Sequence, residues 1–291
     1  MLETVVSSAR ERGEEAVVVT FWPHPRTVLQ QDARDFRILS SLEEKKALLA
    51  AAGIDRVEVI PFTRRFASHT AVQYLELLRD RYDASLVVMG YDNKIGSDGK
   101  TAKEMEDYCS RNPSSLRSSS LPTSLRAVGP LPFTWPRAAT GSGEQQSSIS
   151  STKIRKALAE GDVEGANAML GYSYGLYGVV VAGNRMGRTI GFPTANMQLY
   201  EPLKLVPGDG VYAVDVEVTG NVFKGMCNIG TRPTVGGTSH TIETHILDFS
   251  EDIYGLPLRL RFLRRIRDER KFPSLDALRQ QLELDALNCK K

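Results

Sequence analysis

Residues 183–196 read Gly183-Asn184-Arg185-Met186-Gly187-Arg188-Thr189-Ile190-Gly191-Phe192-Pro193-Thr194-Ala195-Asn196. This stretch lies among short runs of apolar and β-branched residues, separated by Gly, Asn and Pro, that occupy 176–182, 211–218, 223–229, 241–249 and 258–262. Evenly spaced short strands are typical of a closed barrel or a sandwich. The sequence therefore predicts an all-β domain over residues 172–291.

A last helix is expected at the end of this domain. Pro273 ends the preceding segment and Ser274 is a good N-cap. Leu275, Leu278 and Leu282 recur at helical spacing, so they predict the apolar stripe that the helix buries.

Three glycines fall within nine residues of the opening stretch, at Gly183, Gly187 and Gly191. Glycine lets the backbone approach a bound group closely, with amide N–H groups able to meet phosphate oxygens. Arg185 and Arg188 add positive charge. The stretch predicts a phosphate-binding loop; the alternative is a Gly-rich hairpin with ordinary surface polar residues.

Thr194 and Asn196 are two residues apart, so in an extended chain their side chains point to the same face. A hydroxyl and an amide oxygen side by side are hard oxygen ligands. Such ligands suit Mg²⁺ that arrives on a nucleotide polyphosphate. The pair therefore predicts a site for ATP and magnesium.

Transfer of a phosphoryl group to an alcohol also needs a carboxylate that receives the hydroxyl proton. Glu243 is the best candidate, because strand alternation over 241–249 places Glu243 and His245 on one face and Ile242 and Thr244 on the other. The alternative for Glu243 is a solvated surface glutamate. His245 is interpreted as a structural or hydrogen-bonding histidine.

The first 170 residues have a different pattern. Helical periodicity over 2–9, 42–52 and 71–81 alternates with continuous apolar runs at 16–21, 56–62 and 85–90, and two more short helices follow at 151–161 and 163–170. Alternating helices and buried strands predict an α/β domain with a parallel sheet, here over 1–170. Ligands usually bind at the carboxyl ends of such strands, here 21–26, 61–62 and 90–92.

Residues 109–146 are rich in Ser, Pro, Arg and Gly and show no sustained periodicity. One interpretation is a disordered linker. The preferred one is coding sequence read out of frame, between two segments of a single domain. The sequence alone leaves both open.

Composition narrows the functional classes. The 291 residues carry a net charge of +2, which gives no overall field toward nucleic acid or membrane. No apolar run reaches the roughly 18–20 residues that span a bilayer. The three cysteines, Cys109, Cys227 and Cys289, are widely separated, which fits a reducing compartment. A cytoplasmic protein is expected, with no nucleic-acid or membrane partner and an oligomeric state that the sequence does not predict.

Five segments resemble, in order, the signature segments of the riboflavin kinase family: Gly191-Phe192-Pro193-Thr194-Ala195-Asn196, 207–213, 228–237, Glu243-Thr244-His245 and 264–272. The resemblance covers about 115 residues and implies a six-stranded Greek-key barrel with a C-terminal helix. It places the magnesium and ATP ligands at Thr194 and Asn196 and the catalytic carboxylate at Glu243. It also implies that Gly183, Gly187, Gly191 and Arg188 hold phosphates, and that the flavin ring lies near Arg267, Glu269 and the closing helix.

The N-terminal half resembles the FMN adenylyltransferase module of the bacterial bifunctional riboflavin kinase/FAD synthetases, through 20–25, Gly90-Tyr91-Asp92 and 149–155. That family opens with a strand and a histidine-containing loop that handles the ATP phosphates, whereas this sequence starts after them, as an N-terminally truncated member would. Asn93 and Ile95 stand where phenylalanines are common. Because adenylyl transfer needs charge-stabilising groups at the triphosphate, this half is expected to be impaired.

Two functional hypotheses follow. The first is an enzyme that uses ATP and Mg²⁺ to phosphorylate riboflavin to FMN. The second is a non-catalytic flavin- or nucleotide-binding protein that uses the same barrel. Glu243 favours the enzyme, because a binding protein has no need of this carboxylate.

Overall fold

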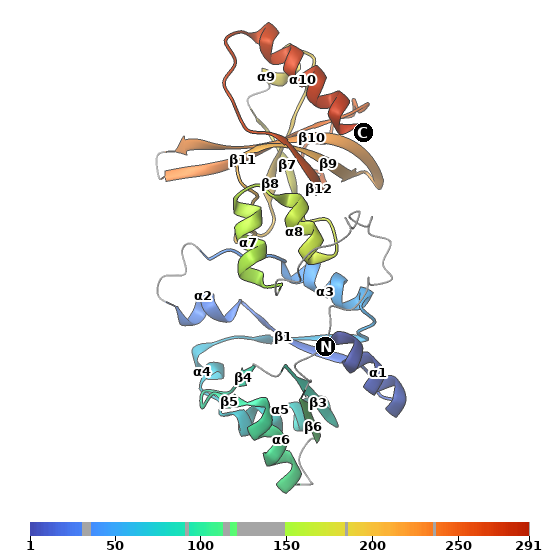
Figure 1. The fold of residues 1–291 in the computed structure, drawn as a ribbon, viewed down its shortest axis with the longest axis vertical. Helices are drawn as coiled ribbons and strands as arrows, with labels where there is room; N and C mark the ends of the chain where they lie inside the picture. Colours follow the sequence, from blue (N-terminus) through green and yellow to red (C-terminus); the bar gives the residue numbers. More distant parts are fainter. Residues whose placement is uncertain are drawn as a thin grey trace. The chain divides into compact units, whose positions relative to one another are not determined.

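The computed structural model describes residues 1–30, 36–90, 93–112, 117–120, 149–183, 186–234 and 237–290. The chain divides into two compact units (Figure 1). Unit 1 comprises residues 1–36 and 42–133, and unit 2 comprises residues 37–41 and 134–291. Among the described residues, every helix is too short or too polar to cross a lipid bilayer.

Unit 1 alternates helices and strands, as the hydrophobic periodicity predicts. Its elements are α1 (Leu2–Arg12), β1 (Val17–Trp22), α2 (Pro25–Leu29), α3 (Leu42–Ala51), β2 (Arg56–Pro61), α4 (Arg64–Ala67), α5 (Ala71–Tyr82), β3 (Leu86–Met89), β4 (Lys94–Ile95), β5 (Lys100–Thr101), α6 (Ala102–Arg111) and β6 (Arg117–Ser120). The α/β class with parallel strands is confirmed, since β1 pairs in parallel with β2 and β3 with β6.

Two details of unit 1 differ from the prediction. The described strands form separate pairs rather than one sheet, and every residue of β1 is partly exposed instead of fully buried. In addition, the segment 109–146 is not featureless throughout, because α6 continues to Arg111 and residues 117–120 form β6 beside β3. Most of the rest of that segment lies outside the described residues, so the choice between linker and frameshift stays open.

An ion pair and a backbone hydrogen bond join α1 to the start of the β1–β2 pair. Arg10 donates two hydrogen bonds to the Asp55 carboxylate, at 2.7 and 2.8 Å, and the backbone N–H of Ala16 donates a third at 2.8 Å. These bonds lower the pKa of Asp55 to about 2, and the hydrogen bond from Arg10 has the largest effect. A carboxyl group whose pKa is depressed on folding stabilises the fold above its unfolded pKa of about 3.9.

We expect unit 1 to lose this contribution as the pH falls from about 4 through the folded pKa of about 2. Urea unfolding at pH 5 and at pH 2.5 checks this in the wild type and in Asp55→Asn. The variant should be less stable at pH 5 and should lose less stability on acidification. Equal acid sensitivity of both proteins would contradict the assignment.

Unit 2 is the predicted barrel with its helices. Its elements are α7 (Ser151–Ala159), α8 (Val163–Leu170), β7 (Gly175–Val181), α9 (Met186–Thr189), β8 (Ala195–Leu199), β9 (Gly210–Val218), β10 (Asn221–Thr234), β11 (Gly237–Ile246), β12 (Pro257–Arg267) and α10 (Leu275–Cys289). The strands close in the order β10-β11-β8-β7-β12-β9, and all pairs are antiparallel. The six-stranded barrel and the C-terminal helix are confirmed.

The interior of the barrel is apolar and includes fully buried Leu176, Ile229 and Phe262. Helices α7 and α8 add Leu158 and Val163 to the same core. The predicted boundary between residues 170 and 172 separates these helices from the barrel, whereas by packing they belong to unit 2. Residues 37–41 join it too, since Ile38 forms a bridge with Lys204.

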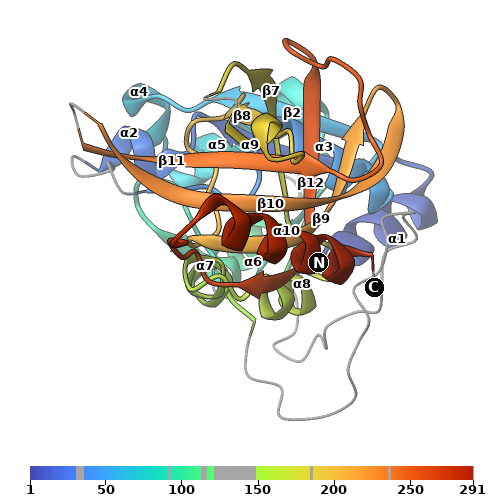
Figure 2. The same cartoon turned by 90° about the horizontal axis from the view of Figure 1, so that it is seen from above.

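Helix α10 lies on the outside of the barrel, against β9 and β10 (Figure 2). Its N-cap is Ser274, as predicted, and the Ser274 side chain accepts a hydrogen bond from the Ala277 N–H. The predicted stripe is wrong at its first position, because 60% of Leu275 is exposed. The buried residues of the helix are instead Asp285 and Cys289.

Candidate functional site

A row of polar residues crosses the outer face of the barrel. In the strand register Asn196 of β8 lies opposite Glu243 of β11, and Glu243 lies opposite Asn228 of β10. Residues directly opposite in an antiparallel pair place their side chains on the same face. Because Ile242 and Thr244 are buried in the barrel interior, the side chains of this row point outward. The alternation predicted for β11 is confirmed.

Thr194 joins this row just before β8. Its hydroxyl donates to Oε2 of Glu243 at 3.5 Å. The structure therefore brings together the three residues predicted to carry the chemistry. Their oxygens match the hard donor set that Mg²⁺ prefers, with most of its ligands coming from phosphates and water. Among the described residues no cluster of three or more His, Cys, Asp or Glu offers a competing metal site.

Gly183 makes room for the Asn196 side chain. A Cβ atom at position 183 would lie 2.1 Å from Nδ2 of Asn196, which is far inside contact distance. Gly191 has a φ of +84°, so it supplies the left-handed turn that leads into Phe192-Pro193-Thr194. Gly187 packs against the backbone oxygen of Phe192, where a Cβ would lie at 2.2 Å. The glycines thus shape the loop around Thr194 and Asn196.

Replacing Gly183 by alanine is expected to lower the turnover number by about tenfold, because the Asn196 amide must leave its present position beside Glu243. The obstructing atoms are the end of a side chain rather than backbone. The barrel should therefore keep its thermal unfolding midpoint. Steady-state kinetics and a thermal melt check both points, and an unchanged turnover number would contradict the role of Gly183.

His245 anchors the loop that carries Thr194. Its Nδ1 lies 2.8 Å from the Pro193 carbonyl oxygen, and its ring contacts Phe192 edge-on at 5.1 Å. Burial lowers the pKa of His245, against the opposing effects of the Pro193 hydrogen bond and of Asp248. A neutral imidazole that donates from Nδ1 to a carbonyl fits the structural role predicted for this residue.

A cavity of about 310 Å³ opens beside Thr194. Arg188 of α9 lines it together with Thr194, so a cation and a hydroxyl face the same space. The segment 249–254 also lines it, with the apolar side chains of Phe249 and Ile253, the ring of Tyr254 and the carboxylates of Glu251 and Asp252. A cation, a hydroxyl and aromatic side chains in one cavity suit a nucleotide. Sequence reasoning assigned no role to residues 249–254, because no motif marks them. Of the predicted phosphate-binding stretch, Asn184 and Arg185 lie outside the described residues.

The other end of the polar row reaches the segment after β12. Asn228 donates from Nδ2 to Oε1 of Glu269 at 3.3 Å, which links Glu269 to the row that contains Glu243. Sequence reasoning assigned no role to Asn228, because only the strand register shows it beside Glu243. Arg267, also predicted near the flavin, forms an ion pair with Asp285 of α10, and its place beside the flavin stays a prediction.

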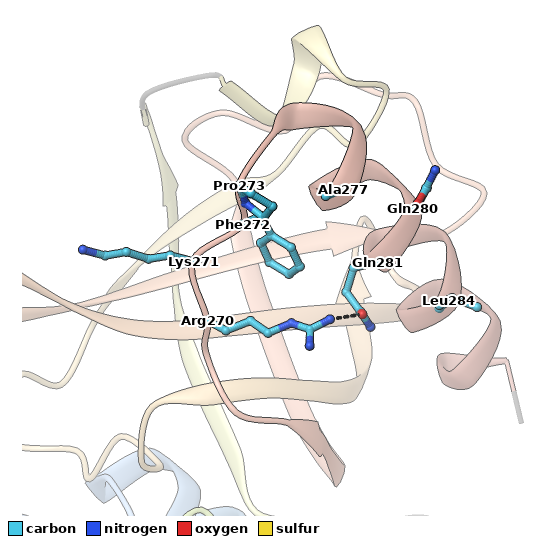
Figure 3. A pocket seen from close by; sticks show the side chains of 8 residues that line it. All are labelled: Arg270, Lys271, Phe272, Pro273, Ala277, Gln280, Gln281 and Leu284. Carbon is cyan, nitrogen blue, oxygen red and sulfur yellow. Dashed lines mark hydrogen bonds between the residues drawn. The ribbon is translucent and has the colours of Figure 1, made fainter.

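A second cavity, of about 380 Å³, lies between this segment and α10. Figure 3 shows Phe272 pointing toward the helix and Lys271 pointing away from it. Arg270 donates a hydrogen bond to Gln281 across the cavity wall. An aromatic ring beside arginine and glutamine side chains suits a planar, polar ring system.

In unit 1 the predicted ligand-binding ends of β1 and β2 carry an aromatic cluster. The ring of Phe21 contacts Phe62 and Phe66, both at 5.4 Å, and Tyr74 at 6.2 Å. Lys45 donates to the Thr20 hydroxyl at 3.2 Å, and burial lowers its pKa. Tyr91 and Asp92 lie outside the described residues.

Comparisons with known proteins match the N-terminal and C-terminal parts of the chain to two different families. A family model described as riboflavin kinase matches residues 170–291, and one described as FAD synthetase matches residues 1–118. The bifunctional riboflavin kinase/FMN adenylyltransferase of Bacillus subtilis (strain 168) is 36% identical over 289 residues, which cover 98% of this chain and 84% of the relative. The protein of the same name from Haemophilus influenzae is 34% identical and covers 99% of this chain and 88% of the relative.

A solved structure is similar over the whole chain. It is described as a macrolide-efflux protein from Streptococcus pneumoniae, with a TM-score of 0.85 and 32% sequence identity. The match covers 100% of this chain and 88% of the chain in that structure. The family models and the two curated relatives do not share that description, and they account for both halves of the chain.

Proposed function

The chain belongs to the family of bifunctional riboflavin kinase/FMN adenylyltransferases, and on this premise we propose that the barrel of unit 2 phosphorylates riboflavin with ATP. A ribityl hydroxyl of riboflavin attacks the γ-phosphorus of ATP. The bond between this phosphorus and the β–γ bridging oxygen breaks. The products are FMN and ADP.

The observation that carries this proposal is the row formed by Asn196 and Glu243, with Thr194 beside it. The Glu243 carboxylate accepts the proton of the attacking hydroxyl, so the oxygen gains nucleophilicity as the new bond forms. Phosphoryl transfer otherwise depends on positioning and on neutralising charge. The loop shaped by Gly183, Gly187 and Gly191 supplies that positioning around the phosphates.

Mg²⁺ fits this site because Thr194 and Asn196 offer two neutral oxygens beside a carboxylate. Thr194 Oγ1 and the Asn196 amide oxygen would hold it, and it supplies neutralisation of the triphosphate charge when bound. Arg188 faces the same cavity as Thr194 and adds a permanent positive charge for the phosphates. The side chains of Phe249, Ile253 and Tyr254 in the same cavity accommodate the nucleoside.

Riboflavin takes the other side of the row. Glu269 reaches Asn228, the neighbour of Glu243 in the register, so a flavin whose ribityl chain ends at Glu243 has its ring toward Glu269 and α10. The cavity of about 380 Å³ is lined by Arg270 and Phe272, which follow Glu269 in the sequence, and by residues of α10. Arg267 contributes to this region through its bond to α10.

Incubation of the chain with riboflavin and Mg-ATP tests the proposal. FMN and ADP should form in equal amounts, and formation should depend on Glu243. Tight riboflavin binding without turnover would support the non-catalytic alternative, which no observation on the fold or the site favours.

The same reaction mixture tests unit 1. Residues 1–118 match the FAD synthetase model, and the relatives carry both activities in their names. The impairment predicted for this half stays a prediction, and the amount of FAD formed from FMN and ATP is the measurement that decides it. Detectable FAD and pyrophosphate would show it to be wrong.

The reaction fits the cytoplasm, where ATP is available. All three cysteines are buried and free, which is consistent with a reducing compartment.

A further inference from the structure

Asp285 lies in the middle of the contact between α10 and the barrel, and none of its surface is exposed. A carboxylate rarely occupies such a position unless it is paired. Around it, Leu282, Ala286 and Cys289 of the same helix pack against Val211 and Met226. Helical periodicity alone would place a leucine at residue 285, so apolar packing does not account for the aspartate.

Both carboxylate oxygens of Asp285 are engaged. Oδ2 accepts from Nε and Nη2 of Arg267, at 2.9 and 2.8 Å. Oδ1 accepts from Nε2 of Gln281, one helical turn earlier, at 2.8 Å. The Arg267 side chain is itself only 17% exposed, so this is a buried ion pair between β12 and α10.

The two partners of Asp285 carry its influence to the segment between β12 and α10. Gln281 accepts a hydrogen bond from Arg270 through its Oε1 (Figure 3). The guanidinium groups of Arg267 and Arg270 lie 5.5 and 4.9 Å from the centroid of the Phe272 ring. One buried carboxylate therefore orients, directly or through one partner, two arginines, a glutamine and an aromatic ring.

Three members of this network also form the second cavity. Arg270, Phe272 and Gln281 line the space of about 380 Å³ (Figure 3). Asp285 does not line it. Any effect of Asp285 on a ligand in this cavity must therefore pass through Gln281 and Arg267.

A gain in folding stability does not explain the buried ion pair between Arg267 and Asp285. Replacing a buried ion pair by apolar residues of similar volume is often neutral or stabilising, because the pair loses its hydration. What an apolar pair cannot do is fix the direction of polar side chains. A binding site needs its contacting groups held in one geometry by the groups behind them.

Building on the proposed function, we propose that Asp285 is a positioning residue for the flavin acceptor. Through Gln281 it fixes Arg270, and through Arg267 it fixes Phe272, so that the cavity wall is shaped for a planar ring before riboflavin binds. Asp285 therefore governs the affinity for riboflavin and leaves the affinity for ATP unchanged.

The test compares Asp285→Asn with Asp276→Asn, a matched change at an exposed position in the first turn of the same helix. We expect Asp285→Asn to raise the KM for riboflavin by about tenfold, with the KM for ATP within twofold of the wild type. Quenching of riboflavin fluorescence should show the same rise in Kd without ATP. Asp276→Asn should behave as the wild type.

A double-mutant cycle separates positioning from a general loss of structure. If Asp285 acts through Gln281, the rise in riboflavin Kd for Asp285→Asn with Gln281→Ala should be smaller than the product of the two single effects. Should Asp285→Asn fail to fold, Arg267→Met with Asp285→Leu removes both charges and keeps the volume. It should fold and still bind riboflavin about tenfold more weakly.

The outcomes are distinguishable. Folded Asp285→Asn with a wild-type riboflavin Kd, or with equal rises in both KM values, overturns this inference alone. A wild-type chain that binds riboflavin without phosphorylating it overturns the proposed function, while the binding measurements still judge Asp285. A wild-type chain that does not bind riboflavin overturns both.

Discussion

Replacing Glu243 by alanine is expected to lower the turnover number for FMN formation by roughly 100-fold or more. The carboxylate lies opposite Asn196 in the register and accepts a hydrogen bond from the Thr194 hydroxyl. In the proposed reaction it is the acidic group between the acceptor alcohol and the nucleotide phosphates. Without it, the hydroxyl proton has no acceptor as the oxygen attacks. The KM values for riboflavin and ATP should change much less than the turnover number.

Two further variants sharpen this prediction. Glu243→Gln keeps the shape and an acceptor for Thr194 but removes the base, so it should be nearly as slow as the alanine variant. Glu217→Ala makes the same chemical change on β9, outside the polar row, where the glutamate pairs with the partly exposed Arg259 and the buried Arg261. It should lower the stability of unit 2, because a buried guanidinium loses one partner, while the folded variant keeps a turnover number within about twofold of the wild type. A wild-type rate for Glu243→Ala would remove Glu243 from its role.

Local sequence signals were sufficient for most of the barrel. In β11, strand alternation placed Ile242 and Thr244 on one face and Glu243 on the other, and the burial of each residue agrees with this division. This works because one face of every barrel strand packs into a single core, so the period of two appears in the sequence. Strand β8 gave no such signal. Its residues Ala195–Leu199 include two amides, and its place depends on pairing with β7 and β11.

Pairing between distant residues explains the other differences. The apolar run at β1 was predicted to be buried on both faces, but burial depends on which strands flank it, and its described partner is β2 alone. In α10 one of the two buried residues is Asp285, whose partner Arg267 belongs to another element. Prediction of a buried helix face uses the polarity of each residue by itself. It therefore misses a charged residue that is buried together with a partner of opposite charge.

The site was predictable to the extent that it is local. Thr194 and Asn196 stand two apart, and Glu243 belongs to a recognisable segment, so their residue types and spacing suggested the chemistry. Asn228 and the cavity wall at 249–254 were missed because they join the site only through strand register and packing. The fold, rather than any local motif, brings these residues to the candidate site.

Changing Asn196 to aspartate is expected to reduce turnover by roughly 100-fold or more, although the two side chains have nearly the same shape. The new carboxylate would lie directly opposite Glu243, and like charges in that position repel each other. It would also lose the amide N–H donors and add negative charge where the triphosphate must bind. The turnover number at saturating Mg-ATP measures this effect.

Gln198→Glu is the matched control for this change, because Gln198 is exposed on the same strand, two residues beyond Asn196. It adds the same charge to the same strand while leaving the pair with Glu243 intact, so its turnover number should stay within twofold of the wild type. If Asn196→Asp were as active as Gln198→Glu, a neutral oxygen at residue 196 would not be required. The metal and phosphate site would then have to be sought elsewhere in unit 2.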